Sequence, residues 1–166
     1  MHGRRTPSGE AIAAVFNATF AATFATVMIP GAPEPLYLPG EGIHPARIFY
    51  RSDFAASALH EAAHWCIAGP TRRRLVDYGY RYVCPPRGVH EKRAFFDAEL
   101  NVQALECVFA QAVGLPFRIS ADDFAVTEEE RAAFEAAVAH RCNERRAARL
   151  PPRTATFLAA LERSLR

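Results

Sequence analysis

Two histidines and a glutamate stand together in the run His60-Glu61-x-x-His64. On a helix, residues four apart lie on one face about a turn from each other, so the two imidazoles could share one metal ion. A zinc ion held there would keep a position open for water, and Glu61 beside it could act as general base in peptide hydrolysis. An Fe(II) ion held by two histidines and one carboxylate would instead be suited to O₂ chemistry.

Two interpretations without catalysis compete with these. His60 and His64 could be core histidines whose ring nitrogens bond to backbone carbonyls, because a buried imidazole needs a partner. Alternatively, the metal could serve only the structure of a non-catalytic module. The motif and its surroundings favour a metal pair, since residues 54–68 carry the apolar pattern of a buried helix.

A third ligand is predicted in the helical pattern of residues 90–113. Glu99, Gln103 and Glu106 form a polar seam at positions i, i+4 and i+7 on an otherwise apolar helix. A carboxylate in such surroundings needs a counter-charge, and a metal ion would supply one. Glu99 is the first candidate, with Asp97 and Glu106 as alternatives. An acid near a helix N-terminus, stabilised by the helix dipole, is the structural interpretation of Glu99.

Helix and strand signals elsewhere predict the elements that position these residues. Asp53 could cap the metal helix, and Gly69-Pro70 would end it. Three tyrosines at period two predict a strand over 76–83, which would either pack in the core or line the metal site, with Tyr80 and Tyr82 as candidate substrate contacts. The remaining expected elements are helices over 9–27, 128–148 and 154–165, a strand over 47–50 and an extended segment over 34–39.

These elements predict an α+β protein in which about five helices pack on a small sheet, with a metal helix like that of zincins. We expect one metal-dependent domain spanning 1–166, with residues 1–8 as a candidate for disorder. The four cysteines are far apart and form no Cys-x-x-Cys pair, which is typical of reduced thiols in the cytoplasm. Cys66 and Cys107 fall in apolar helical runs and are expected to pack in the core.

Charge and hydropathy limit the partners. A net charge of +2 gives no reason to expect nucleic-acid binding, and no apolar run is long enough to cross a membrane. We expect a monomer. The cluster that contains Arg72 and Arg73 is either a solvated face or a dock for an acidic partner protein.

Motifs from about residue 12 onward follow one another in an order that resembles a known family. They are Phe16-Asn17-x-Thr19-Phe20, Glu34-Pro35-x-Tyr37-Leu38-Pro39, Ala56-Ser57-Ala58-Leu59-His60-Glu61-x-x-His64-Trp65-Cys66-Ile67-Ala68-Gly69, Arg72-Arg73, Asp77-x-Gly79-Tyr80, Glu99-x-x-x-Gln103-Ala104-Leu105 and Gly114-x-Pro116-Phe117. The sequence thereby resembles the bacterial elongation factor P hydroxylases, and the resemblance covers nearly the whole chain.

The resemblance implies a non-haem iron monooxygenase that hydroxylates the lysine of elongation factor P after that lysine has received its β-lysyl extension. It implies Fe(II) held by His60, His64 and Glu99, with zinc or another divalent ion able to occupy the same site, and O₂ as cosubstrate. Glu61 would then orient ligands or relay protons rather than activate water. No histidine is followed two residues later by an acid, so 2-oxoglutarate is not expected.

Overall fold

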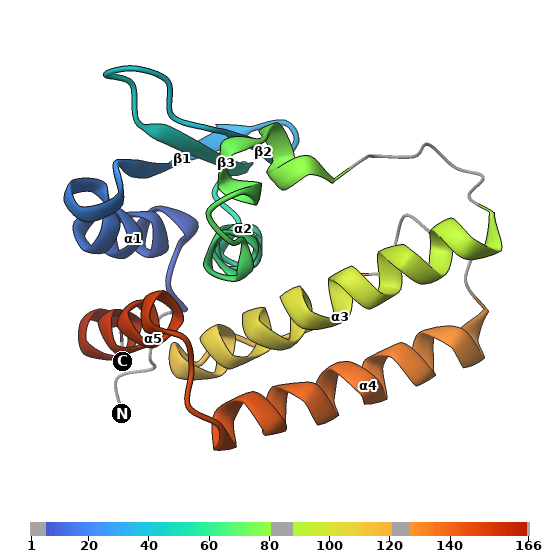
Figure 1. Ribbon diagram of the computed structural model, residues 1–166. Helices are drawn as coiled ribbons and strands as arrows, with labels where there is room; N and C mark the ends of the chain where they lie inside the picture. Colours follow the sequence, from blue (N-terminus) through green and yellow to red (C-terminus); the bar gives the residue numbers. More distant parts are fainter. Residues whose placement is uncertain (1–5, 81–87, 121–126, 166) are drawn as a thin grey trace, which may run out of the picture.

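The computed structural model describes residues 6–80, 88–120 and 127–165. Within these residues, five α-helices and a three-stranded sheet form the predicted α+β fold (Figure 1). In chain order the elements are α1 Gly9–Phe24, β1 Thr26–Ala32, β2 Leu36–Leu38, β3 Ala46–Arg51, α2 Ala55–Ile67, the 3₁₀ helices η1 Arg72–Arg74 and η2 Val76–Gly79, α3 Val89–Ala112, α4 Glu128–Ala147 and α5 Pro152–Leu165.

The sheet is mixed and has the strand order β1-β3-β2. β3 runs parallel to β1, with Met28 beside Ile48, and antiparallel to β2, with Tyr37 opposite Ile48. Along β3 the buried residues alternate with more exposed ones, as expected for a strand with one face on the core. Met28, Tyr37, Ile48 and Tyr50 form the buried face, which α1 and α2 cover.

Helix α2, which carries the two histidines, is at the centre of the fold. It lies between the sheet and α3, and it also contacts α1 and α5 (Figure 1). Alanines supply much of its buried surface and allow neighbouring elements to approach closely. Trp65 near its end packs on Phe16 and Phe20 of α1, and Phe157 of α5 joins the same aromatic cluster. Both ligand candidates of α2 are therefore held on a helix that is packed on several sides.

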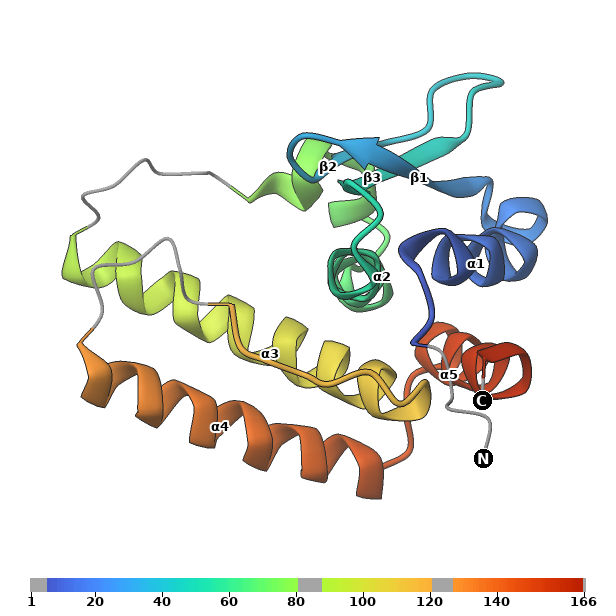
Figure 2. The same ribbon diagram turned by 180° about the vertical axis from the view of Figure 1, so that it is seen from behind.

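Helices α3 and α4 lie side by side and run parallel, on the side of α2 that faces away from the sheet (Figure 2). Helix α4 begins at the predicted capping box, in which Thr127 Oγ1 accepts a hydrogen bond from the Glu130 amide and Glu130 Oε2 accepts one from the Thr127 amide. Cys142 packs its thiol on Cys107 of α3, and Cys66, Cys107 and Cys142 are buried free thiols. No helix in the described residues is long and apolar enough to span a membrane.

The predicted cap of the metal helix was wrong. The residue before α2 is Phe54, which makes no side-chain cap. Asp53 instead turns toward the start of α1, where its Oδ1 accepts a hydrogen bond from the amide of Glu10. Helix α1 also ends earlier than predicted, at Phe24, because Ala25 has a left-handed conformation and β1 begins directly after it.

The strand predicted over 76–83 was also wrong for the residues that the structure describes. Val76–Gly79 forms the 3₁₀ helix η2, in which Asp77, Tyr78 and Gly79 all have positive φ. Tyr37 binds both 3₁₀ helices: its amide donates to Asp77 Oδ1 of η2 at 2.8 Å, and its hydroxyl donates to the carbonyl of Arg73 in η1 at 2.8 Å. Residues 81–83 lie outside the described residues.

Candidate metal centre

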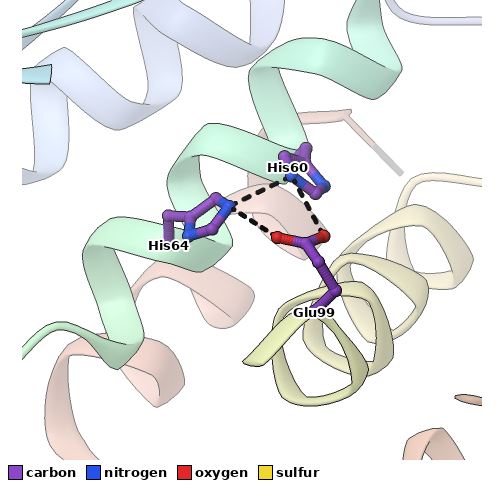
Figure 3. A group of neighbouring side chains, drawn as sticks. All are labelled: His60, His64 and Glu99. Atoms are coloured by element: carbon purple, nitrogen blue, oxygen red, sulfur yellow. Dashed lines mark hydrogen bonds and ion pairs between the residues drawn. The ribbon is translucent and has the colours of Figure 1, made fainter. Parts of the chain in front are cut away.

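Three side chains meet between α2 and α3 (Figure 3). His60 and His64 project from α2, and Glu99 projects from α3 toward both. The two Nε2 atoms are 3.1 Å apart, and the Glu99 carboxylate oxygens lie 3.4 Å from His64 Nε2 and 3.7 Å from His60 Nε2. Four donors placed at zinc-like bond lengths around one ion would be roughly 3.4 Å apart. The separations and the donor types therefore fit a single divalent ion.

The carboxylate of Glu99 is held by its own helix and by the chain beyond it. Gln103, one turn later on α3, donates from Nε2 to Glu99 Oε2 at 3.1 Å. The same amide group also donates to the carbonyl of Ser120 at 2.9 Å and accepts from the Ser120 amide at 3.0 Å. With its amide bonded to Ser120 in both directions, Gln103 has little freedom to rotate, so the direction of the Glu99 carboxylate is fixed as well.

Asp97 and Glu106, the two alternatives to Glu99 as third ligand, lie outside the ligand group. Asp97 is exposed and is absent from the ligand group. Glu106 is buried and lies behind His60, with its Oε2 2.8 Å from His60 Nδ1, the ring nitrogen that faces away from Glu99 and His64. The structure thus brings His60, His64 and Glu99 together and places Glu106 next to them without including it in the group.

Each charged form in this group is stabilised by its neighbours, as the pKa shifts of His60 and Glu99 indicate. Burial lowers the pKa of His60, but the hydrogen bond to Glu106 and the charges of Glu106 and Glu99 outweigh it and raise that pKa to about 10. Burial raises the pKa of Glu99, yet its hydrogen bond to His64 and the charge of His60 lower it to about 2. A carboxylate this acidic is ionised at neutral pH and offers both oxygens to a cation.

Glu61 is buried on α2 directly after the first histidine, and it does not belong to the ligand group. Burial raises its pKa, while the positive charges of His64 and His60 oppose the shift. A buried carboxyl group whose pKa is raised, next to two imidazoles, is suited to exchanging a proton with a neighbouring group. Its position agrees with either role considered for it, general base or proton relay.

Tyrosines form one wall of the centre. The ring of Tyr78 stacks on Tyr37, with centroids 4.2 Å apart, and lies nearly parallel to the His64 ring at 6.0 Å. Tyr80 meets His64 edge to face at 5.6 Å. Tyr82 lies outside the described residues. Tyr78 belongs to the predicted tyrosine face, but Tyr37, far away in sequence, carried no signal that would associate it with this wall.

The arginines after α2 differ from one another. The Arg72 guanidinium lies over the Tyr80 ring, 4.6 Å from its centroid, at the edge of the tyrosine wall. The half-buried Arg73 lies 5.6 Å from the centroids of both Trp65 and Phe24. Arg74 is exposed. Part of this cluster therefore packs on aromatic rings rather than forming a wholly solvated face.

Comparison with known proteins shows the family to which this chain belongs. Residues 15–166 match the family model described as elongation factor P hydroxylase. The chain belongs to the elongation factor P hydroxylase family. A curated relative from Haemophilus influenzae, named elongation factor P lysine hydroxylase, is 37% identical over 153 residues, which cover 92% of this chain and 86% of the relative.

The match to the elongation factor P hydroxylases includes every element of the centre. It begins inside α1 and extends through α2, η1, η2 and α3 to the end of the chain. His60, His64, Glu99 and Glu106 all lie within it. The ligand group is consequently part of the region that this chain shares with the elongation factor P hydroxylase family, rather than an addition to it.

Proposed function

We propose that this protein hydroxylates the lysine side chain of elongation factor P that carries a β-lysyl extension, as a metal-dependent monooxygenase. The observation that carries the proposal is the meeting of two imidazoles and one carboxylate in a chain of this family. Such a donor set leaves coordination positions open, which suits non-haem Fe(II). We also propose that the protein acts as a cytoplasmic monomer.

His60, His64 and Glu99 would hold the Fe(II) ion, which when bound would supply the chemistry that inserts one atom of O₂ into a lysyl C–H bond, while the other atom leaves as water with two electrons and two protons that an external reductant and the solvent supply. The ionised Glu99 carboxylate offers the negative charge that a dication needs, and Gln103 keeps it aimed at the histidines. Glu61 would hold or relay a proton beside this group.

Tyr80 and Tyr82, with Arg72 and Arg73, are the proposed contacts of the substrate. Tyr80 lies at the edge of His64, and Arg72 covers its ring, so a side chain that reaches the metal from this side would pass both. The exposed Arg72 guanidinium would face the partner protein, where acidic groups of that protein could meet it. Arg73, packed on Trp65, would act mainly by supporting this edge.

A zinc peptidase is the competing function, because Glu61 lies beside the histidines and its pKa is raised. Anaerobically purified protein loaded with Fe(II) should be mixed with β-lysylated elongation factor P and a chemical reductant, then exposed to O₂. Mass spectrometry of the modified peptide should show a gain of one oxygen atom that His64→Ala abolishes. Peptide cleavage that persists without O₂ and needs Zn²⁺ would support the peptidase instead.

A further inference from the structure

Glu106 is a buried acid whose position the proposed reaction does not explain. It lies on α3, seven residues after Glu99, between the buried Leu105 and Cys107. A carboxylate in such surroundings is costly unless a specific partner compensates for its lost hydration. The partner is His60, whose Nδ1 lies 2.8 Å from Glu106 Oε2. The arrangement therefore has a cost that the contact with His60 must offset.

The contact falls on the ring nitrogen that the ligand group does not use. Nε2 of His60 faces His64 and Glu99, whereas Nδ1, on the other side of the ring, faces Glu106. An ionised carboxylate can only accept a hydrogen bond, so Nδ1 must carry the proton. A ligand imidazole must be neutral, so with the proton kept on Nδ1 the Nε2 proton is the one that an ion would displace, which leaves the lone pair on Nε2 pointing toward the site where the ion would be bound.

We propose that Glu106 is a positioning residue of the metal centre, which fixes the tautomer and the ring orientation of His60 from behind. The inference rests on the proposed metal centre. A carboxylate behind a ligand imidazole also makes that imidazole a stronger donor, because the negative charge stabilises the partial positive charge that binding places on the ring. Helix α3 would then supply both a ligand, Glu99, and the support of a second ligand.

Metal affinity tests the proposal, with Zn²⁺ as the probe and a competing fluorescent chelator as the readout. Glu106→Ala should weaken Zn²⁺ binding about 10- to 100-fold, the usual effect of losing such a partner. The Zn²⁺ affinity of Glu106→Gln should lie between those of wild type and Glu106→Ala, since the glutamine amide oxygen still accepts a hydrogen bond from Nδ1 but carries no charge. Because glutamine has nearly the volume of glutamate, Glu106→Gln also leaves no cavity and can be measured if Glu106→Ala folds poorly.

A matched control separates positioning from a general loosening of α3. Cys107→Ala removes the neighbouring buried side chain, whose thiol contacts Cys142 of α4. It should lower thermal stability and leave Zn²⁺ affinity within about twofold of wild type. Nitrogen-15 NMR of the Zn²⁺-loaded protein should show a slowly exchanging His60 Nδ1 proton in wild type and Cys107→Ala, but not in Glu106→Ala.

The outcomes are distinct. Equal Zn²⁺ affinity in wild type and Glu106→Ala would refute the role of Glu106 and leave the metal centre intact. An equal loss in Glu106→Ala and Cys107→Ala would also refute it. If the wild-type protein bound no divalent ion, both the metal centre and this inference would fall. If Zn²⁺ affinities follow the predicted order but elongation factor P is never hydroxylated, only the proposed activity fails.

Discussion

Arg153 of α5 should be one of the side chains on which the metal helix most depends. Its guanidinium donates hydrogen bonds to the carbonyls of Trp65 at 2.9 Å, Cys66 at 3.3 Å and Ala68 at 2.7 Å. These are carbonyls at the end of α2, which have no partner within the helix. The guanidinium also lies over the Trp65 ring, 4.7 Å from its centroid. One side chain therefore satisfies the C-terminus of the helix that carries both histidines.

Arg153→Ala should lower the free energy of unfolding by about 3 kcal/mol. Hydrogen bonds to a charged donor contribute about 1.5–3 kcal/mol, and we count the three here together because they share one guanidinium. The stacking on Trp65 adds about 0.5–1 kcal/mol. In a domain of this length each kcal/mol changes the melting temperature by about 2–4 °C, so the variant should melt about 6–12 °C lower.

Thermal unfolding followed by circular dichroism measures this change. Arg163→Ala, which removes an exposed arginine from the same helix, is the matched control and should melt within about 1 °C of wild type. The melting temperature of Arg153→Lys should lie between those of Arg153→Ala and Arg163→Ala, because an ammonium group cannot reproduce the planar fork that reaches three carbonyls. A melting temperature of Arg153→Ala within about 1 °C of the control would refute this account of how α2 ends.

Three further predictions concern the centre and its surroundings. Gln103→Ala should weaken Zn²⁺ binding about tenfold, because Glu99 loses the donor that aims its carboxylate; an unchanged affinity would show that Glu99 needs no such support. Burial raises the pKa of Cys66 and Cys107 to about 12, so both remain neutral thiols at pH 8 and should react with iodoacetamide far more slowly in the folded than in the unfolded protein; equal rates would contradict their burial. Arg74→Glu should raise KM for elongation factor P and weaken its salt dependence, whereas an unchanged KM would make Arg74 a solvated residue without a docking role.

The sequence predicted those parts of the centre that the helix repeat determines. The four-residue spacing of His60 and His64 places both on one face of α2 wherever that helix packs, and the apolar pattern of 54–68 located the helix to within a residue. The seam on α3 identified Glu99 and Glu106 together. Glu99 was the first candidate, but spacing alone left Glu106 as an alternative, because both belong to one seam and only the placement of α3 across α2 decides which acid faces which ring nitrogen.

The errors occurred where contacts distant in sequence decide the conformation. Three tyrosines at period two resemble a strand, but Asp77 accepts from the amide of Tyr37, 40 residues earlier, and Tyr78 stacks on the same tyrosine. These contacts hold Asp77 and Tyr78 at positive φ, which local propensity disfavours. Asp53 was likewise available as a cap for α2, yet its carboxylate binds the start of α1.

The central claim is that this chain inserts oxygen from O₂ into its protein substrate, and isotope labelling tests it most directly. Fe(II)-loaded protein, a reductant and β-lysylated elongation factor P should be exposed to ¹⁸O₂ in ordinary water, with Glu99→Ala as the ligand-loss control. The account predicts one ¹⁸O atom on the modified lysine with wild-type protein and none with Glu99→Ala. Oxygen that came from water, or equal labelling by the variant, would contradict the claim that these three side chains hold the metal of a monooxygenase.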